Sequence, residues 1–105
     1  MTYAMKPLSC DPARAKGLSE KLIINHYENN YSGAVKRLNA IVTQLSQLDF
    51  ASAPVFVVNG LKREELVATN SMILHELFFD GLGEQSEPGA FLREALARDF
   101  GSYER

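Results

Sequence analysis

The sequence predicts an all-α fold, a long antiparallel helical hairpin followed by a shorter third helix. Two observations support this prediction. Residues 19–48 contain no proline, and apolar side chains recur there every three or four residues, the spacing of one face of an α-helix. The same spacing returns over residues 62–80, and it is followed by Gly81 and Gly83, residues that commonly end a helix.

The first long helix is expected to begin after Ser19, because serine commonly caps helix N-termini. Upstream of it, residues 12–17 predict a short turn of helix that ends at a glycine. Asparagines and a glycine between residues 29 and 33 are weak helix formers, so a kink is expected there. The apolar stripe of this helix consists of Leu22, Tyr27, Tyr31, Ala34, Val35, Leu38, Ile41, Val42, Leu45 and Leu48.

The segment 49–60 interrupts the helical pattern. Pro54 stops a helix, and residues 59–60 (NG) are a turn signal. Residues 55–58 (VFVV) could form a strand, but a strand without a partner is not stable. We therefore interpret this run as a connection that packs its apolar side chains against the helices.

The second and third helices are expected over residues 62–80 and 88–100. Pro88 suits the first turn of a helix, where its missing N–H group has no consequence. Ser102 then provides a new N-cap just before the chain ends, so either the chain frays there or it is the front part of a longer protein. The stripe of the second helix consists of Leu66, Val67, Asn70, Ile73, Leu74, Leu77 and Phe78.

Composition limits the classes of function. The 105 residues, 46% of them hydrophobic, amount to a single domain, 1–105, and the formal net charge is −2. Because the net charge is small and slightly negative, neither nucleic acid nor an anionic membrane surface is an expected partner. No apolar run approaches the roughly 20 residues of a membrane span. The N-terminus has no apolar signal-peptide region, and the lone Cys10 can form no internal disulfide, so we expect a cytoplasmic location.

Two histidines, His26 and His75, lie one in each long helix. Imidazole is the commonest metal ligand in proteins, so two of them on facing helices are compatible with a metal site. A lone histidine beside the apolar stripe of a helix is, however, more often a hydrogen-bonded residue of the core or its edge. Glu76 points about 100° away from His75 on a helix and is a poor co-ligand, whereas Ser71 lies one turn before His75 and could hydrogen-bond to it.

Three segments, in this order, resemble the iron/manganese superoxide dismutases. Residues 26–39, which begin HYENNY, resemble the first helix of that family, where a His-Tyr or His-His pair starts the segment and its first histidine binds the metal. Residues 70–79 (NSMILHELFF) resemble the helix that carries a second ligand histidine followed by aromatic residues. Residues 87–104, from EPGA to RDFGSYE, resemble the linker into the family's second domain.

The resemblance implies an N-terminal helical-hairpin domain in which His26 and His75 bind iron or manganese. The remaining ligands, an aspartate and a histidine, would come from a C-terminal α/β domain that the chain does not contain. The implied function is that of an antioxidant oxidoreductase that converts its substrate, superoxide, to dioxygen and hydrogen peroxide. We also expect the chain to form a homo-oligomer. With half of the ligands, the isolated chain is expected to be inactive and to bind metal weakly unless a second chain completes the site.

The surroundings of the implied site depart from the family. Asn30 stands where a second histidine usually follows the first ligand, and Ala34 stands near the position of a gating tyrosine. Ser71 stands near the glutamine of iron-type members. Because outer groups of this kind tune a metal centre, we take Tyr27, Asn30 and Ser71 as its candidate supporting residues.

Two classes of function therefore remain open. The first is a superoxide dismutase, of which this chain is the N-terminal half. The second is a non-catalytic helical module that dimerises through its exposed apolar stripe, because such patches drive association.

Overall fold

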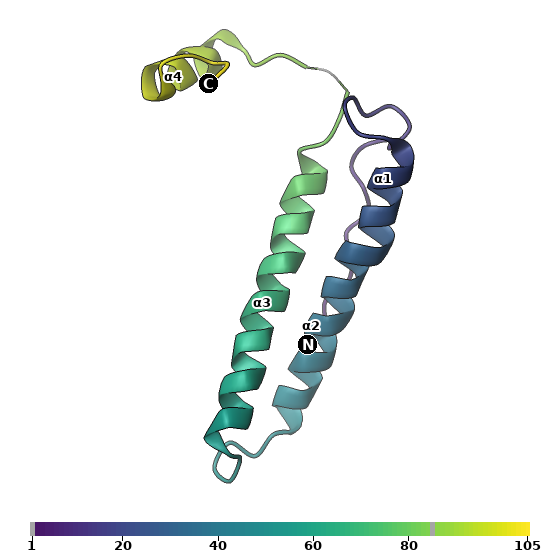
Figure 1. Cartoon of the computed structure of the whole chain (residues 1–105), viewed down its shortest axis with the longest axis vertical. Helices are drawn as coiled ribbons and strands as arrows, with labels where there is room; N and C mark the ends of the chain where they lie inside the picture. The colour runs from purple at the N-terminus through teal and green to yellow at the C-terminus, as the bar shows by residue number, and fades with distance from the viewer. Residues whose placement is uncertain (1, 85) are drawn as a thin grey trace.

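A computed structural model describes residues 2–84 and 86–105 and confirms the all-α class, since these residues form no strand. The first arm of the hairpin consists of α1 (Glu20–Asn25), η1 (His26–Tyr31) and α2 (Ser32–Gln47). The second arm is α3 (Val55–Asp80), which runs antiparallel to the first (Figure 1). The third helix is α4 (Ala90–Phe100).

The first arm begins as the sequence predicts. The Ser19 hydroxyl accepts a hydrogen bond from the Leu22 N–H group at 3.1 Å, which caps α1. The segment before it closes a single hydrogen-bonded turn, from the Arg14 N–H group to the Asp11 carbonyl, and is not the helical turn predicted over residues 12–17. Gly17 has a φ of 86°, the left-handed conformation expected of a glycine there.

The middle of the first arm is a π-helical turn, η1, where the sequence predicts a kink. The Ser32 N–H group bonds to the Tyr27 carbonyl, five residues back, instead of the α-helical four. A π-turn accommodates an extra residue without ending the helix. The first arm therefore stays continuous through its weak helix formers.

The second arm begins seven residues earlier than predicted, so the interpretation of residues 55–58 as a connection is wrong. Pro54 lies before the first turn of α3, where its carbonyl accepts the N–H groups of Val57 and Val58 and its own missing N–H group is not needed. The preceding Asp49 carboxylate organises the loop by accepting from the Ala51 N–H group and the Ser52 hydroxyl. Proline therefore starts this helix, and the predicted turn at 59–60 lies inside it.

The core lies between α2 and α3. Residues of the predicted stripe on the first arm are largely buried, with Tyr31 and Leu38 each 1% exposed. Leu22 is an exception, since it is 50% exposed and the adjacent Ile23 is buried in its place. On α3, however, the predicted stripe is wrong, because most of its apolar members are exposed and the buried residues are Ala68, Met72 and Phe79. Both faces of α3 are apolar, and the face that carries the small Ala68 packs against the first arm. We call the exposed set the outer face of α3: Leu66, Val67, Ile73, Leu74, Leu77 and Phe78.

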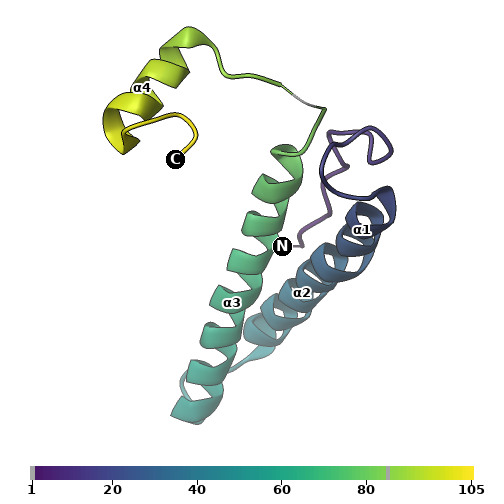
Figure 2. The ribbon, with the colours of Figure 1, turned by 45° about the horizontal axis from the view of Figure 1, so that its top comes forward.

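The third helix lies apart from the hairpin. Figure 2 shows α4 beyond the end of α3, and within the described residues it packs against none of the other helices. Phe91 is accordingly 89% exposed. The predicted bounds of this helix, 88–100, agree with α4 to within two residues. No helix of the described part of the chain is both long and apolar enough to span a membrane.

An extended N-terminal segment, residues 3–8, runs along the hairpin, and we call it the N-terminal strap. Its Tyr3 backbone exchanges two hydrogen bonds with the Asn39 side chain, at 2.7 and 2.8 Å. Its Lys6 carbonyl accepts from the Tyr27 hydroxyl at 2.6 Å, and the Lys6 N–H group donates to the Tyr31 hydroxyl at 2.9 Å. The strap is therefore fastened to η1 and α2 by side chains of the first arm.

Candidate metal centre

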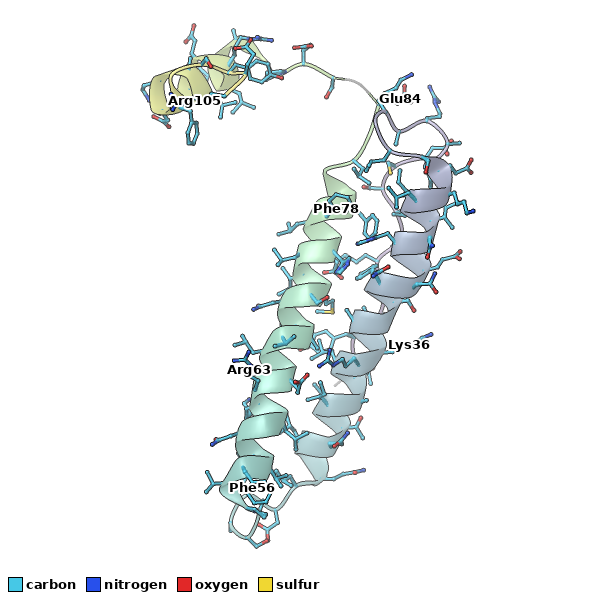
Figure 3. All side chains as sticks on the ribbon, in the orientation of Figure 1. Lys36, Phe56, Arg63, Phe78, Glu84 and Arg105 are labelled. Carbon is cyan, nitrogen blue, oxygen red and sulfur yellow. The ribbon has the colours of Figure 1, made fainter. Side chains whose placement is uncertain are left out.

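The two histidines of the chain face each other across the hairpin. His26 comes from the start of η1 and His75 from α3, and their ring centroids lie 4.9 Å apart with 34° between the ring planes. The pair lies at the level of Phe78, near the end of α3 that leads toward α4 (Figure 3). Two residues 49 positions apart in the sequence thus come into contact because the two arms are antiparallel.

The π-turn determines which side chains join this pair. In an α-helix, residues five positions apart point about 140° away from each other, whereas the i→i+5 bonding of a π-turn stacks them on nearly one face. His26 and Tyr31 are five positions apart, and both rings contact Phe79, at 5.8 and 5.9 Å. Both also lie against His75. A regular helix would turn one of them away from α3.

The hydrogen bond of His75 defines the tautomer of its ring. Nδ1 lies 2.6 Å from the Ser71 carbonyl oxygen and 3.3 Å from the Ser71 hydroxyl. Because a carbonyl can only accept, Nδ1 carries the hydrogen, and in the neutral ring Nε2 keeps its lone pair. This is the arrangement of a metal-binding histidine, in which one nitrogen donates to a backbone carbonyl and the other binds.

The histidine pair lies in apolar surroundings. A hollow of about 240 Å³ is lined by His26, Leu74, His75 and Phe78. Phe79 is 3% exposed and contacts both imidazoles from the core side. Phe79 thus closes the core side of the pair, whereas Leu74 and Phe78, which are 64% and 46% exposed, leave its other side open.

The pair fits a metal ion as part of a ligand set. With metal–nitrogen bonds of about 2.1 Å, the centres of two imidazoles on one ion lie roughly 4.5–6 Å apart, depending on the angle at the ion. The observed 4.9 Å falls in this range. Among the described residues, no group of three or more histidine, cysteine, aspartate or glutamate side chains is arranged to hold a metal. In the described part of the chain the site is therefore two facing imidazoles at a spacing that one ion could span, without a third candidate ligand grouped with them.

Comparison with known proteins finds relatives of the whole chain. No protein-family profile matches the chain. Over all 105 residues, however, it is 66% identical to an iron superoxide dismutase of Cupriavidus metallidurans, of which it covers 53%. It is 32% identical over 97 residues to an iron superoxide dismutase of Aquifex aeolicus, covering 86% of this chain and 46% of the relative.

The chain is homologous to the N-terminal half of iron and manganese superoxide dismutases. A manganese superoxide dismutase of Haloferax volcanii is 30% identical to it over 99% of the chain and 53% of the relative. The chain thus spans about half the length of the superoxide dismutases it matches.

The three candidate supporting residues of this superoxide dismutase homologue, Tyr27, Asn30 and Ser71, differ in how closely they approach the histidine pair. Ser71 contacts His75 directly, as described above. Asn30 and Ala34 line a second hollow of about 210 Å³, which Ser71 also borders, one helical turn from the pair. The Tyr27 hydroxyl, in contrast, donates to the carbonyl of Lys6 in the strap.

A buried polar contact beside the pair is not apparent from the sequence pattern. The Tyr31 hydroxyl donates to Glu76 Oε2 at 2.5 Å, and Glu76 Oε1 lies 3.9 Å from the Lys6 ammonium. Burial, followed by the hydrogen bond to Glu76, raises the pKa of Tyr31 to about 12. The sequence indicates that Tyr31 is a packing residue and that Glu76 points away from His75, but neither pattern reveals that the two meet.

Proposed function

We propose that this chain provides His26 and His75 as two ligands of an iron or manganese ion in a superoxide dismutase. The other ligands would come from residues outside this chain. The observation that supports the proposal is the facing pair of imidazoles, 4.9 Å apart, with Nε2 of His75 left free to bind. The similarity to iron and manganese superoxide dismutases over the whole chain supports the same metals.

The residues of the chain have separate roles in this proposal. A bound iron or manganese ion would supply the one-electron chemistry of superoxide dismutation. His26 and His75 hold it as neutral nitrogen ligands, which suit these metals. Ser71 orients the His75 ring through its carbonyl, and the buried Phe79 packs against both imidazoles from the core side.

Asn30, Ser71 and Tyr27 are proposed to adjust the site without binding the metal. Asn30 and Ser71 border the hollow beside Ala34, where small polar side chains leave room for water. Tyr27 acts through the strap, since its hydroxyl is bonded to Lys6. These roles predict changes in metal preference and rate, and not loss of the metal.

The decisive experiment measures metal binding to the 105-residue chain and to its histidine variants. We expect His26→Ala and His75→Ala each to lower Mn²⁺ affinity by at least about 100-fold, because one of two imidazole ligands is lost. Lys36→Ala, on the exposed side of α2, is the matched control and should leave affinity unchanged. Elemental analysis of the purified chain then gives the metal and its stoichiometry.

The alternative that each histidine is structural predicts the opposite pattern. In that case either alanine variant would unfold the chain, as measured by circular dichroism, and the Mn²⁺ binding of the parent chain would not depend on the two imidazoles. This result would contradict the proposed function.

The exposed apolar surface favours a second role, in self-association. Leu74, Leu77 and Phe78 on the outer face of α3 are 64%, 63% and 46% exposed. We propose that this face contacts further protein in a homo-oligomer, consistent with the non-catalytic interaction module as the alternative function. Sedimentation of the chain over a hundred-fold range of concentration tests it, and a strictly monomeric profile would contradict it.

A further inference from the structure

Tyr31 connects three segments of the chain beside the histidine pair. Its side chain is 1% exposed, and its ring stacks on His75 with 6.2 Å between centroids and 18° between planes. Its hydroxyl donates to Glu76 on α3 and accepts the Lys6 N–H group of the strap. A single side chain therefore ties η1 to α3 and to the N-terminal strap.

We propose that Tyr31 is a positioning residue: its hydroxyl, held by Glu76 and Lys6, fixes the end of the π-turn and so keeps His26 against His75. The proposal rests on the proposed function for its consequence, metal affinity. Its structural part, the control of the π-turn, can be tested without metal.

The π-turn requires such an anchor because it is not the conformation that a free helix prefers. Without tertiary contacts, α-helical bonding is favoured, and π-turns persist mainly as single turns at functional sites. A return to α-helical bonding would rotate one end of η1 by about 100° relative to the other. Either His26 or Tyr31 would then leave the face of α3.

The anchor acts on both histidines because of where its partners lie. Tyr31 ends the π-turn that His26 begins. Glu76 directly follows His75 on α3 and is largely buried, with 13% of its side chain exposed. The 2.5 Å bond between Tyr31 and Glu76 therefore joins the two backbone segments that carry the metal-binding rings.

Three variants separate this hydrogen bond from simple packing. Tyr31→Phe keeps the ring against His75 and Phe79 and removes the hydroxyl. Glu76→Gln keeps a carbonyl oxygen that can accept from Tyr31 and removes the charge. Tyr3→Phe is the matched control, because Tyr3 lies at the other end of the strap and is bonded there through its backbone.

Hydrogen–deuterium exchange of the metal-free chain is the first measurement. We expect the amides of residues 26–32 to exchange at least about ten-fold faster in Tyr31→Phe than in the parent, with those of residues 38–45 unchanged. Glu76→Gln should change the same amides less than three-fold, and Tyr3→Phe should leave them unchanged. Equal exchange of η1 in Tyr31→Phe and the parent, or an unprotected η1 in the parent, would overturn the proposal.

Titration with Mn²⁺ alone, followed by the electron paramagnetic resonance signal of the free ion, is the second measurement. We expect Tyr31→Phe to bind Mn²⁺ about ten-fold more weakly than the parent, as is typical when a group supporting a metal ligand is lost. Equal affinity, in a parent that loses binding with His26→Ala, would overturn the positioning role and leave the proposed function intact. If instead His26→Ala has no effect on Mn²⁺ binding, the proposed function fails, and the exchange measurement still decides whether Tyr31 fixes the π-turn.

Discussion

Both faces of α3 carry apolar residues, but those of the inner face are buried and those of the outer face are exposed. The inner face presents Ala68, Met72 and Phe79, which are 1%, 6% and 3% exposed against the first arm. The outer face presents larger aliphatic side chains, among them Leu66 and Leu74, which are 59% and 64% exposed. Hydrophobicity alone therefore does not decide burial here. The inner face is the one that carries the small Ala68, which allows close approach of the two arms, and Phe79, which packs against both histidines from the core side.

The largest test of this comparison removes one leucine from the core, on α2 where the inner face of α3 packs, and one from the outer face of α3. Leu38→Ala deletes a side chain that is 1% exposed in the core, and we expect it to lower the free energy of unfolding by about 2–5 kcal/mol. Leu74→Ala makes the same chemical change on the outer face and should alter it by less than about 0.5 kcal/mol. Urea denaturation followed by circular dichroism measures both, and equal losses would mean that the outer face is packed in solution.

Alkaline pH tests the polar contact on the inner side. Since the pKa of Tyr31 is raised to about 12 in the folded chain, only the unfolded chain loses this proton between pH 10 and 12. The stabilisation by Tyr31 is therefore complete below pH 10 and decreases by about 1.4 kcal/mol per pH unit above it. Unfolding free energies of the parent and Tyr31→Phe across this range give the difference directly, and parallel curves would contradict the shift.

The contacts of the inner face show which features of the fold can be predicted from the sequence and which cannot. Helical periodicity predicts the hairpin, the third helix and the stripe on the first arm, because burial of one face repeats at helical spacing. The spacing of His26 and His75 also places both in facing helices. Periodicity cannot choose between two apolar faces of α3, since that choice depends on how closely the arms approach. It also cannot reveal the bond between Tyr31 and Glu76.

Local signals mislead where their effect depends on position within an element. Proline ends a helix from the inside but begins one from the position before its first turn, and Pro54 occupies the latter. Weak helix formers near Gly33 predict a kink, and the first arm contains a π-turn there and continues as a helix. Position within the element therefore decides the effect of the proline, because it lies before the first turn of α3.

Two glycines of the N-terminal half, Gly17 and Gly33, test the backbone preference of glycine, and the expected changes in unfolding free energy are smaller than for Leu38→Ala. Gly33 lies inside α2 with open space around the position of a β-carbon, so Gly33→Ala should stabilise the chain by about 0.5–1 kcal/mol. Gly17 has a φ of 86°, so Gly17→Ala should destabilise it by about 1–2 kcal/mol. Thermal unfolding resolves the opposite signs, and a destabilised Gly33→Ala would mean that this face of α2 is covered by protein.

The smallest expected effect on stability is also the sharpest test of the outer face. Leu74→Gln combined with Leu77→Gln replaces two side chains that are 64% and 63% exposed, so the free energy of unfolding should change by less than about 0.5 kcal/mol. Self-association of the chain should nevertheless weaken, because the apolar area that drives it is reduced. Sedimentation at high concentration measures this, with Lys36→Ala as the control on the exposed side of α2. Unchanged association would locate the contact elsewhere, and the exposed ring of Phe91 on α4 would then be the next residue to replace, since this helix packs against none of the others in the described part of the chain.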